Sequence, residues 1–264
     1  MIAMHIKWKG KEAKFWLLSL LMMLLAGNVF SVPFMDGEKL SFDVKYGLIN
    51  AAEATLEARS SVYQGSPVWM LSTNARTQPF FDRIFKVRDR VESWWDKDTL
   101  LPYKFAKNLQ EGSYKQHRVH IYNHEAKTST YQKWSFTNSR FDNSQMDIPS
   151  GSQDILSAFY SVRGLPLVVG RSVIVNIVAD GLIMKTEVVV HRKESLKTIF
   201  GEIECLVIEP KLKGEAVFKQ SGRILIWITN DEYKIPVRLE SKITIGSFVA
   251  VLKSAQQVPL RVRS

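Results

Sequence analysis

The chain has 264 residues, 45% of them hydrophobic, and a formal net charge of +10 at pH 7. Its single cysteine, Cys205, excludes an intramolecular disulfide, so stability must come from a sizeable core. The positive charge favours contact with anionic lipids, lipopolysaccharide or acidic glycans, although scattered Lys and Arg also serve solubility alone.

The N-terminus has the pattern of a signal peptide. Four lysines between Lys7 and Lys14 precede the uncharged apolar run 15–26, FWLLSLLMMLLA. This run suits the core of a signal peptide and falls short of the roughly 20 residues that span a bilayer as a helix. Small or medium residues before Val32 offer a cleavage point, with Ala26 as a second candidate. An uncleaved N-terminal anchor is the alternative.

Cleavage would remove residues 1–31 and leave 32–264 as a single β-rich domain. The remainder has 32 basic and 25 acidic residues, so its formal charge is +7. No cysteine lies near the cleavage point, so attachment of lipid to an N-terminal Cys is excluded. We therefore expect a periplasmic protein that is not a lipoprotein. We also expect no transmembrane segment after cleavage, and no nucleic-acid partner, because export separates the two.

Alternation of apolar and polar residues dominates the first part of the mature chain. It predicts a strand at 40–46 and a second at 52–59, joined in a hairpin after Gly47. A helix is the alternative for the Ala-rich second segment. The small alanines on its inner face suggest that another element packs closely against it. Further strands are predicted at 68–73, 84–95, 103–109, 114–122 and 127–136.

One segment has a different period. Apolar residues repeat at helical spacing within 150–164, which predicts a single short helix. Ser150 or Ser152 could cap its N-terminus, and Gly164 and Pro166 mark its end.

The chain then returns to strands. The Asp180-Gly181 pair predicts a tight hairpin between strands at 172–178 and 184–190. Further strands are predicted at 203–208, 222–229, 237–245 and 248–252, followed by a frayed basic tail at 253–264.

Together these elements indicate an all-β, mainly antiparallel protein. Regular short strands favour a barrel-like or strongly curved sheet with one short central helix. The helix lies near the midpoint of the mature chain, so a two-half organisation would have its seam near 150–166.

Candidate catalytic groups are few. In a strand, with about 3.3 Å per residue, His117 and His120 point to opposite faces, and His124 lies about 13 Å from His120. This spacing does not suit a metal site. Five carboxylates between Asp82 and Asp98 alternate with basic residues, which favours ion pairing over a glycosidase pair. The sequence thus predicts no catalytic residue, no metal and no cofactor, and an enzyme such as a hydrolase is disfavoured.

Aromatic residues suggest a different role. A closed or curved sheet can line its interior with such side chains and hold an apolar ligand, although a filled core would use the same residues. Arg163 follows the helix, where it could cap the last carbonyls or hold an anionic head group. The predicted ligand-facing residues are Phe42, Tyr46, Leu56, Trp95, Phe105, Arg163 and Trp227.

Three segments carry a family resemblance: 40–55 (LSFDVKYGLINAAEAT), 153–163 (QDILSAFYSVR) and 226–238 (IWITNDEYKIPVR), with 245–247 after the last. In this order, over nearly all of the mature chain, the sequence resembles domain-of-unknown-function family 3108 of exported Gram-negative proteins. The resemblance implies an antiparallel, barrel-like fold and an exported protein. It implies no activity.

Two hypotheses follow. The first is a periplasmic protein that binds or carries an apolar or anionic lipid-like ligand, such as a lipid or lipopolysaccharide component. The second is an envelope assembly or scaffold protein that binds another envelope protein through an exposed sheet edge.

Overall fold

The computed structural model describes residues 32–213, 222–242 and 247–260. The predicted signal peptide, residues 1–31, lies outside this part of the chain. The end of the strand predicted at 237–245 and the last four residues of the basic tail also lie outside it. The described residues belong to one compact unit, Val32–Ser264.

The described residues form one antiparallel sheet of fourteen strands. A single α-helix, α2 (Ile155–Arg163), and a short 3₁₀ turn, η1 (Phe81–Arg83), accompany it. The strands are β1 (Glu38–Tyr46), β2 (Ile49–Tyr63), β3 (Ser66–Thr77), β4 (Arg88–Asp96), β5 (Pro102–Glu111), β6 (Tyr114–Asn123), β7 (Thr128–Ser135), β8 (Arg140–Asp147), β9 (Ser172–Ala179), β10 (Leu182–Thr198), β11 (Gly201–Leu212), β12 (Arg223–Thr229), β13 (Pro236–Lys242) and β14 (Ser247–Gln256).

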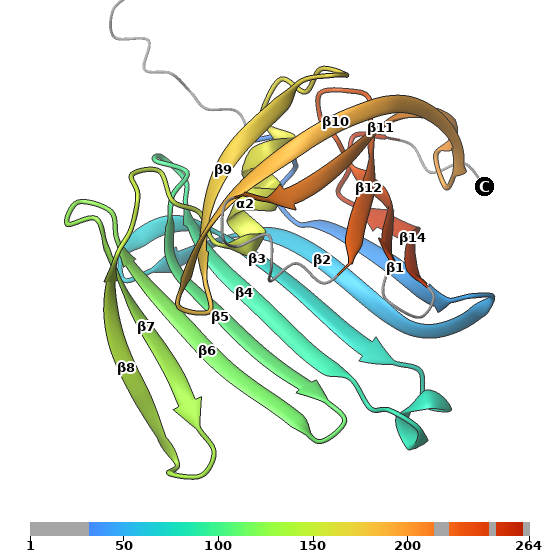
Figure 1. The fold of residues 1–264 in the computed structure, drawn as a ribbon. Coiled ribbons are helices and arrows are strands. Elements are labelled where there is room, and N and C mark those ends of the chain that lie inside the picture. The colour runs from blue at the N-terminus through green and yellow to red at the C-terminus, as the bar shows by residue number, and fades with distance from the viewer. Residues whose placement is uncertain (1–31, 214–221, 243–246, 261–264) are drawn as a thin grey trace, which may run out of the picture. The chain divides into compact units, whose positions relative to one another are not determined.

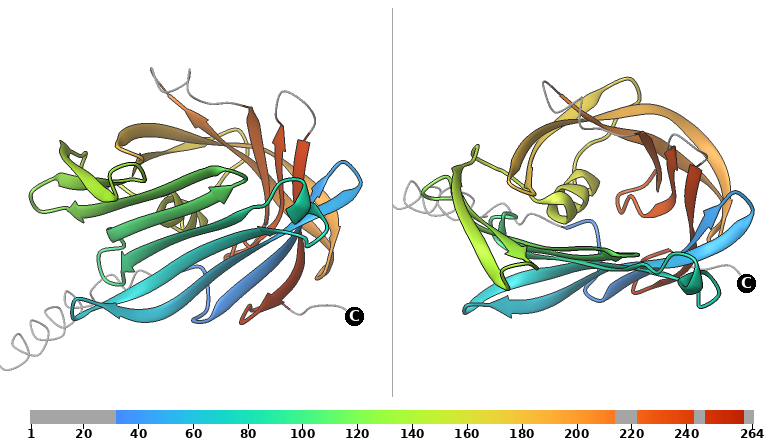
Figure 2. Two further views of the ribbon diagram at one scale, coloured as in Figure 1. Left: turned by 90° about the horizontal axis from the view of Figure 1, so that it is seen from below. Right: turned by 60° about the horizontal axis from the view of Figure 1, so that its bottom comes forward.

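The strand order is a meander interrupted at one point. It runs β8-β7-β6-β5-β4-β3-β2-β1-β14-β13-β12-β11-β10-β9, so the first and last strands pair in the middle of the sheet. The two edges, β8 and β9, are consecutive in sequence, and the segment between them carries α2. The sheet curls around this helix (Figures 1 and 2). The predicted fold class is therefore confirmed, as a curled rather than closed sheet.

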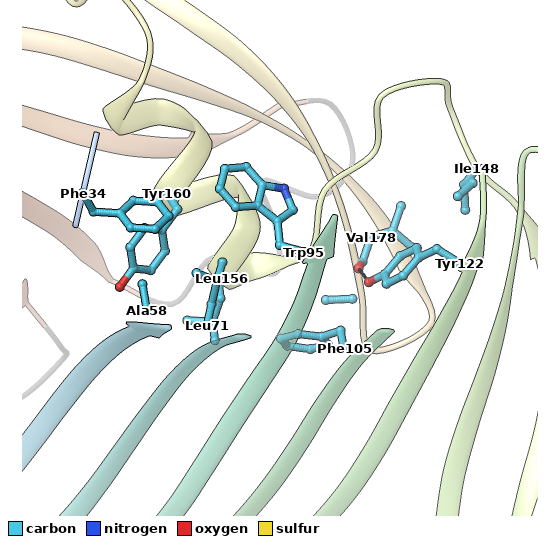
Figure 3. Close-up of a cluster of buried hydrophobic side chains, with 11 residues drawn as sticks. Phe34, Ala58, Leu71, Trp95, Phe105, Tyr122, Ile148, Leu156, Tyr160 and Val178 are labelled. Atoms are coloured by element: carbon cyan, nitrogen blue, oxygen red, sulfur yellow. Dashed lines mark hydrogen bonds between the residues drawn. The ribbon is translucent and has the colours of Figure 1, made fainter. Parts of the chain in front are cut away.

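The edge strand β9 meets the chain that leads into the helix. Gln153 forms an isolated parallel bridge with Ile177, and the Val178 N–H donates to the Gln153 carbonyl at 2.8 Å. Strand β9 also contacts the half of the sheet that ends at β8, because the Tyr122 hydroxyl of β6 donates to the Val178 carbonyl at 2.7 Å (Figure 3). Hydrogen bonds of this kind, rather than strand pairing of β8 with β9, join the two ends of the sheet.

The described core contains three apolar clusters. Figure 3 shows the first, where Leu156 and Tyr160 of the helix meet Trp95, Phe105 and other side chains of the sheet. The second gathers Leu40, Trp227 and their neighbours, and the third lies between the helix and β9–β12. β12 is buried along most of its length, as its continuous apolar sequence predicts for a strand covered on both faces.

Several predicted boundaries were wrong. The strand predicted at 84–95 begins at Arg88, because Asp82 accepts hydrogen bonds from Thr77 and Arg88 and closes a turn before it. β14 continues to Gln256, into the part predicted to fray, because it pairs with β1 as far as Lys39.

Strand β8 and the helix cap also differ from the sequence prediction, which had no strand at β8 and placed the cap at another residue. The sequence of β8, RFDNSQMD, is mostly polar because this edge strand is largely exposed. The N-cap of α2 is Asp154 rather than Ser150 or Ser152. Its carboxylate accepts from the N–H groups of Leu156 and Ser157, so it meets two helix donors that lack intrahelical partners.

Candidate functional site

A cavity of about 370 Å³ lies between α2 and the concave face of the sheet. Its wall comes from the helix, from β1–β3 and from β9–β14. The lining residues are apolar except for three threonines, Thr55, Thr73 and Thr186. Ligand sites for small molecules are typically apolar hollows of roughly 300–1,000 Å³ with a few polar groups, and this cavity matches that description.

The helix presents one face to the cavity. Ile155, Phe159 and Val162 line it, and their spacing of four and three residues places them on one side of α2. Leu156 also borders the cavity, and together with Tyr160 it packs in the first apolar cluster. Ile155 and Phe159 keep exposed surface, so the cavity is open to solvent rather than sealed.

Small side chains on the sheet leave this space open. Ala54 of β2 and Ala250 of β14 lie on the wall, one on each side of β1. Further along β2, Ala58 is fully buried in the cluster that contains Leu156 and Tyr160. The small side chain of Ala58 thus leaves room for helix residues to pack against β2, and that of Ala54 leaves room for the cavity.

A buried ion pair holds the C-terminal end of the helix. The Arg163 guanidinium donates to both carboxylate oxygens of Glu38, at 2.6 and 2.8 Å, and to the carbonyls of Pro33 and Tyr233. The two side chains are 1% and 0% exposed. Burial disfavours the charged guanidinium, but the hydrogen bond and charge of Glu38 outweigh it and raise the pKa of Arg163.

The N-terminal end of the helix is fixed by Asp154. Its carboxylate accepts from the Ser93 hydroxyl of β4 at 2.6 Å, in addition to the two helix N–H groups. The Ser157 hydroxyl accepts from the Asp154 N–H at 2.9 Å, which completes a capping box. Burial raises the pKa of Asp154 to about 6, while these hydrogen bonds act in the opposite direction.

The turn between β9 and β10 docks onto β5–β7. Asp180 pairs with Lys107, and the Gly181 N–H donates to Nε2 of His120 at 3.0 Å. This bond requires a neutral imidazole, in keeping with burial, which lowers the pKa of His120 to about 4. With φ of 53° and 75°, Asp180 and Gly181 form the predicted tight turn. A Cβ on Gly181 would lie 2.9 Å from the Tyr131 ring.

Other reactive groups lie away from the cavity. Cys205 is buried in the second apolar cluster, and burial raises the pKa of its thiol to about 12. Among the described residues, no group of three or more His, Cys, Asp or Glu side chains is placed to hold a metal ion. Arg88 pairs with Asp82 and Arg90 with Glu92, the ion pairing predicted for this segment. The hydrogen bond with Arg88 lowers the pKa of Asp82 to about 2.

The comparisons with known proteins bear on the fold and the family. The model of a family described as a protein of unknown function, DUF3108, matches residues 41–253. The chain belongs to the DUF3108 family. No curated protein matches it.

A solved structure resembles this DUF3108 chain in fold. It is a β-barrel-like protein of domain of unknown function DUF1849 from Brucella abortus, with 9% sequence identity and a TM-score of 0.56. The match covers 86% of this chain and 99% of that one. A protein with a YmcC-like fold from Bacteroides fragilis has 10% identity, covers 86% and 99% of the two chains, and has a TM-score of only 0.29. The likeness to the first shows a shared barrel-like fold.

The structure separates the residues predicted to face a ligand. Phe42 and Leu56 line the cavity of the DUF3108 chain. Trp95 and Phe105 are buried in the first apolar cluster and Trp227 in the second, away from the cavity wall. A filled core uses the same large apolar residues as a ligand site, and Trp95, Phe105 and Trp227 lie in the core.

Tyr46 and Arg163 also differ from their predicted positions. The Tyr46 side chain is 40% exposed and packs against Phe248, because it lies at the end of β1 beyond the cavity. Arg163 neither caps the helix carbonyls nor faces a ligand, because Glu38 and two backbone carbonyls of other segments occupy its donors.

Sequence reasoning missed the helix as a wall of the cavity. The helical spacing of Ile155 and Phe159 was visible, but it did not reveal which side of α2 would remain uncovered. The contributions of Ile177 and Ile226 also depend on how the sheet curls. The described helices include none that is long and apolar enough to cross a membrane.

Proposed function

We propose that this protein is exported to the periplasm and binds an apolar or lipid-like molecule in the cavity between α2 and the sheet. The observation that carries the proposal is the cavity itself, about 370 Å³ in volume, with an almost wholly apolar wall. Enclosing an apolar group there removes its surface from water, which contributes roughly 25 cal/mol per Å².

The wall is held in place without a ligand. The ion pair of Arg163 with Glu38 fixes one end of the helix, and the hydrogen bond of Asp154 with Ser93 fixes the other. A preformed site loses little conformational entropy on binding, which favours affinity. We infer a binding or carrier role and no catalytic step.

Support for the location comes from the sequence. The lysine-rich start and the apolar run 15–26 have the pattern of a cleavable signal peptide. The basic mature chain suits contact with anionic lipids of the envelope. Fractionation of cells, with the N-terminus of the recovered protein sequenced, tests this part of the proposal. Recovery in the cytoplasm with residues 1–31 intact would contradict it.

Filling the cavity tests the binding role. Ala54→Phe places a ring in the cavity, whereas Ala126→Phe adds the same ring in the exposed turn between β6 and β7. With N-phenyl-1-naphthylamine, an uncharged dye that fluoresces in apolar surroundings, we expect saturable binding to the wild type and Ala126→Phe. We expect Ala54→Phe to bind at least about tenfold more weakly. Equal binding to all three proteins would contradict the proposal.

A scaffold role is the second candidate. The edge strand β8 pairs with β7 on one side only, and most of its residues are exposed. Such an edge can accept a strand of a partner protein. Stable capture of one envelope protein, lost on substitution of Ser144 by Pro, would favour this role over the carrier.

A further inference from the structure

Three cations lie side by side across the sheet. Lys107 of β5 is directly opposite Arg118 of β6, and Arg118 is opposite Lys133 of β7. Directly opposite residues of antiparallel strands point to the same face of a sheet. Lys107, Arg118 and Lys133 therefore form one row, called here the cationic row.

The cationic row shares its face with the cavity. Leu56 and Thr73, on the cavity wall, are opposite each other on β2 and β3. The same line of directly opposite residues continues through Val91 of β4 to Lys107. Neighbouring strands are about 4.8 Å apart, so Lys107 begins roughly 10 Å from Thr73 along this line. The apolar wall of the cavity and the cationic row are thus neighbours on the same concave face of the sheet.

The positive charges of the cationic row do not stabilise the sheet. Like charges directly opposite each other destabilise a sheet. Lys107 is offset by its ion pair with Asp180, and its side chain is only 13% exposed. In the part of the chain that the structure describes, no carboxylate forms an ion pair with Arg118 or Lys133. Asp142, opposite Lys133 on β8, pairs with Arg140 instead.

From this arrangement we propose that the cationic row binds the anionic head group, carboxylate or phosphate, of a single-chain amphiphile whose chain occupies the cavity. The inference rests on the proposed binding function and names its ligand class. Arg118 is half-buried next to Lys107 and donates from Nη1 to the His117 carbonyl at 3.4 Å. Its other guanidinium N–H groups supply the donors for such a group. Lys133, which is exposed, adds charge at the solvent end of the row.

The test compares three ligands of equal chain length: a fatty acid, an alkyl phosphate and an uncharged fatty alcohol. The variant is R118Q/K133Q, which leaves the Lys107–Asp180 pair intact. The control is K115Q/K185Q, which removes the same charge from exposed lysines outside the row. Thermal unfolding of each protein shows that it is folded, and removal of neighbouring like charges is expected to preserve stability.

We expect R118Q/K133Q to bind the anionic ligands at least about tenfold more weakly, with the alcohol unchanged. The control should bind all three like the wild type. The anion that loses more affinity identifies the head group. Equal loss for acid, phosphate and alcohol, or no loss, would overturn the role of the row while leaving the cavity proposal in place. Failure of the alcohol itself to bind the wild type would overturn both.

Discussion

Glu38 and Arg163 form a fully buried, bidentate ion pair between residues 125 positions apart. Glu38 begins β1, in the middle of the sheet, and Arg163 ends α2. The pair therefore connects the sheet to the helix that covers one side of the cavity. A buried pair of this kind fixes an arrangement more than it adds net stability, because desolvation offsets much of the attraction.

Breaking the pair should be costly. Glu38→Ala leaves the Arg163 guanidinium buried without its carboxylate, and we expect a loss of about 3–5 kcal/mol in the free energy of unfolding. The double variant Glu38→Leu/Arg163→Met removes both charges and should lose clearly less. Urea unfolding measures both. A single variant as stable as the wild type would show that the pair does not hold the helix.

The acid stability of the protein should depend on His120. Its pKa is about 4 in the folded state, below the usual value of 6.5. The unfolded chain therefore binds the proton first, and stability contributed by neutral His120 is lost as pH falls from about 6.5 to about 4. The loss should reach about 3 kcal/mol. Unfolding across this range should show a shallower pH dependence in His120→Gln than in the wild type, and parallel curves would contradict the assignment.

Asp154 should act with the opposite sign. Its folded-state pKa of about 6 lies above the usual 3.8, so the folded chain holds the proton more tightly. Stability from this group is present at low pH and is lost as pH rises from about 3.8 to about 6. Asp154→Asn keeps a capping side chain and should flatten this dependence, whereas Asp154→Ala should also lose about 1–2 kcal/mol with the cap. Equal stability of the Asn and Ala variants would argue against the cap.

The β9–β10 turn offers a matched pair of glycines. Gly181→Ala would place a Cβ 2.9 Å from Tyr131, whereas Gly47→Ala, also at positive φ, meets nothing within 4 Å. Both should lose about 1 kcal/mol to backbone strain, and Gly181→Ala about 1–3 kcal/mol more. Thermal unfolding of the two variants separates the loss from backbone strain from the loss caused by the contact with Tyr131. Equal losses would mean that the turn is not packed against β7.

Much of the fold could be predicted because it follows from local patterns. Alternation in β1 reflects a more buried and a less buried face, and the 3.6-residue period of α2 reflects apolar side chains that pack against the sheet. Asp180-Gly181 specifies its own turn. β8 could not be found this way, because an exposed edge strand buries too little to leave an alternating pattern.

The site was less predictable, because it depends on contacts far apart in sequence. Parity placed Phe42 and Leu56 inside the sheet, but it could not distinguish a cavity wall from the filled core around Trp95. The pairing of β1 with β14 decides which strands surround the helix. Nothing near Arg163 in the sequence indicates that Glu38 will occupy its donors.

Native mass spectrometry of the protein, purified without detergent, shows directly whether the cavity holds a ligand. We expect a stoichiometric apolar or anionic single-chain ligand on the wild type, recovered by solvent extraction, and a reduced occupancy on Ala54→Phe. A wild-type mass equal to that of the chain alone, unchanged after incubation with envelope lipids, would contradict the proposed binding role.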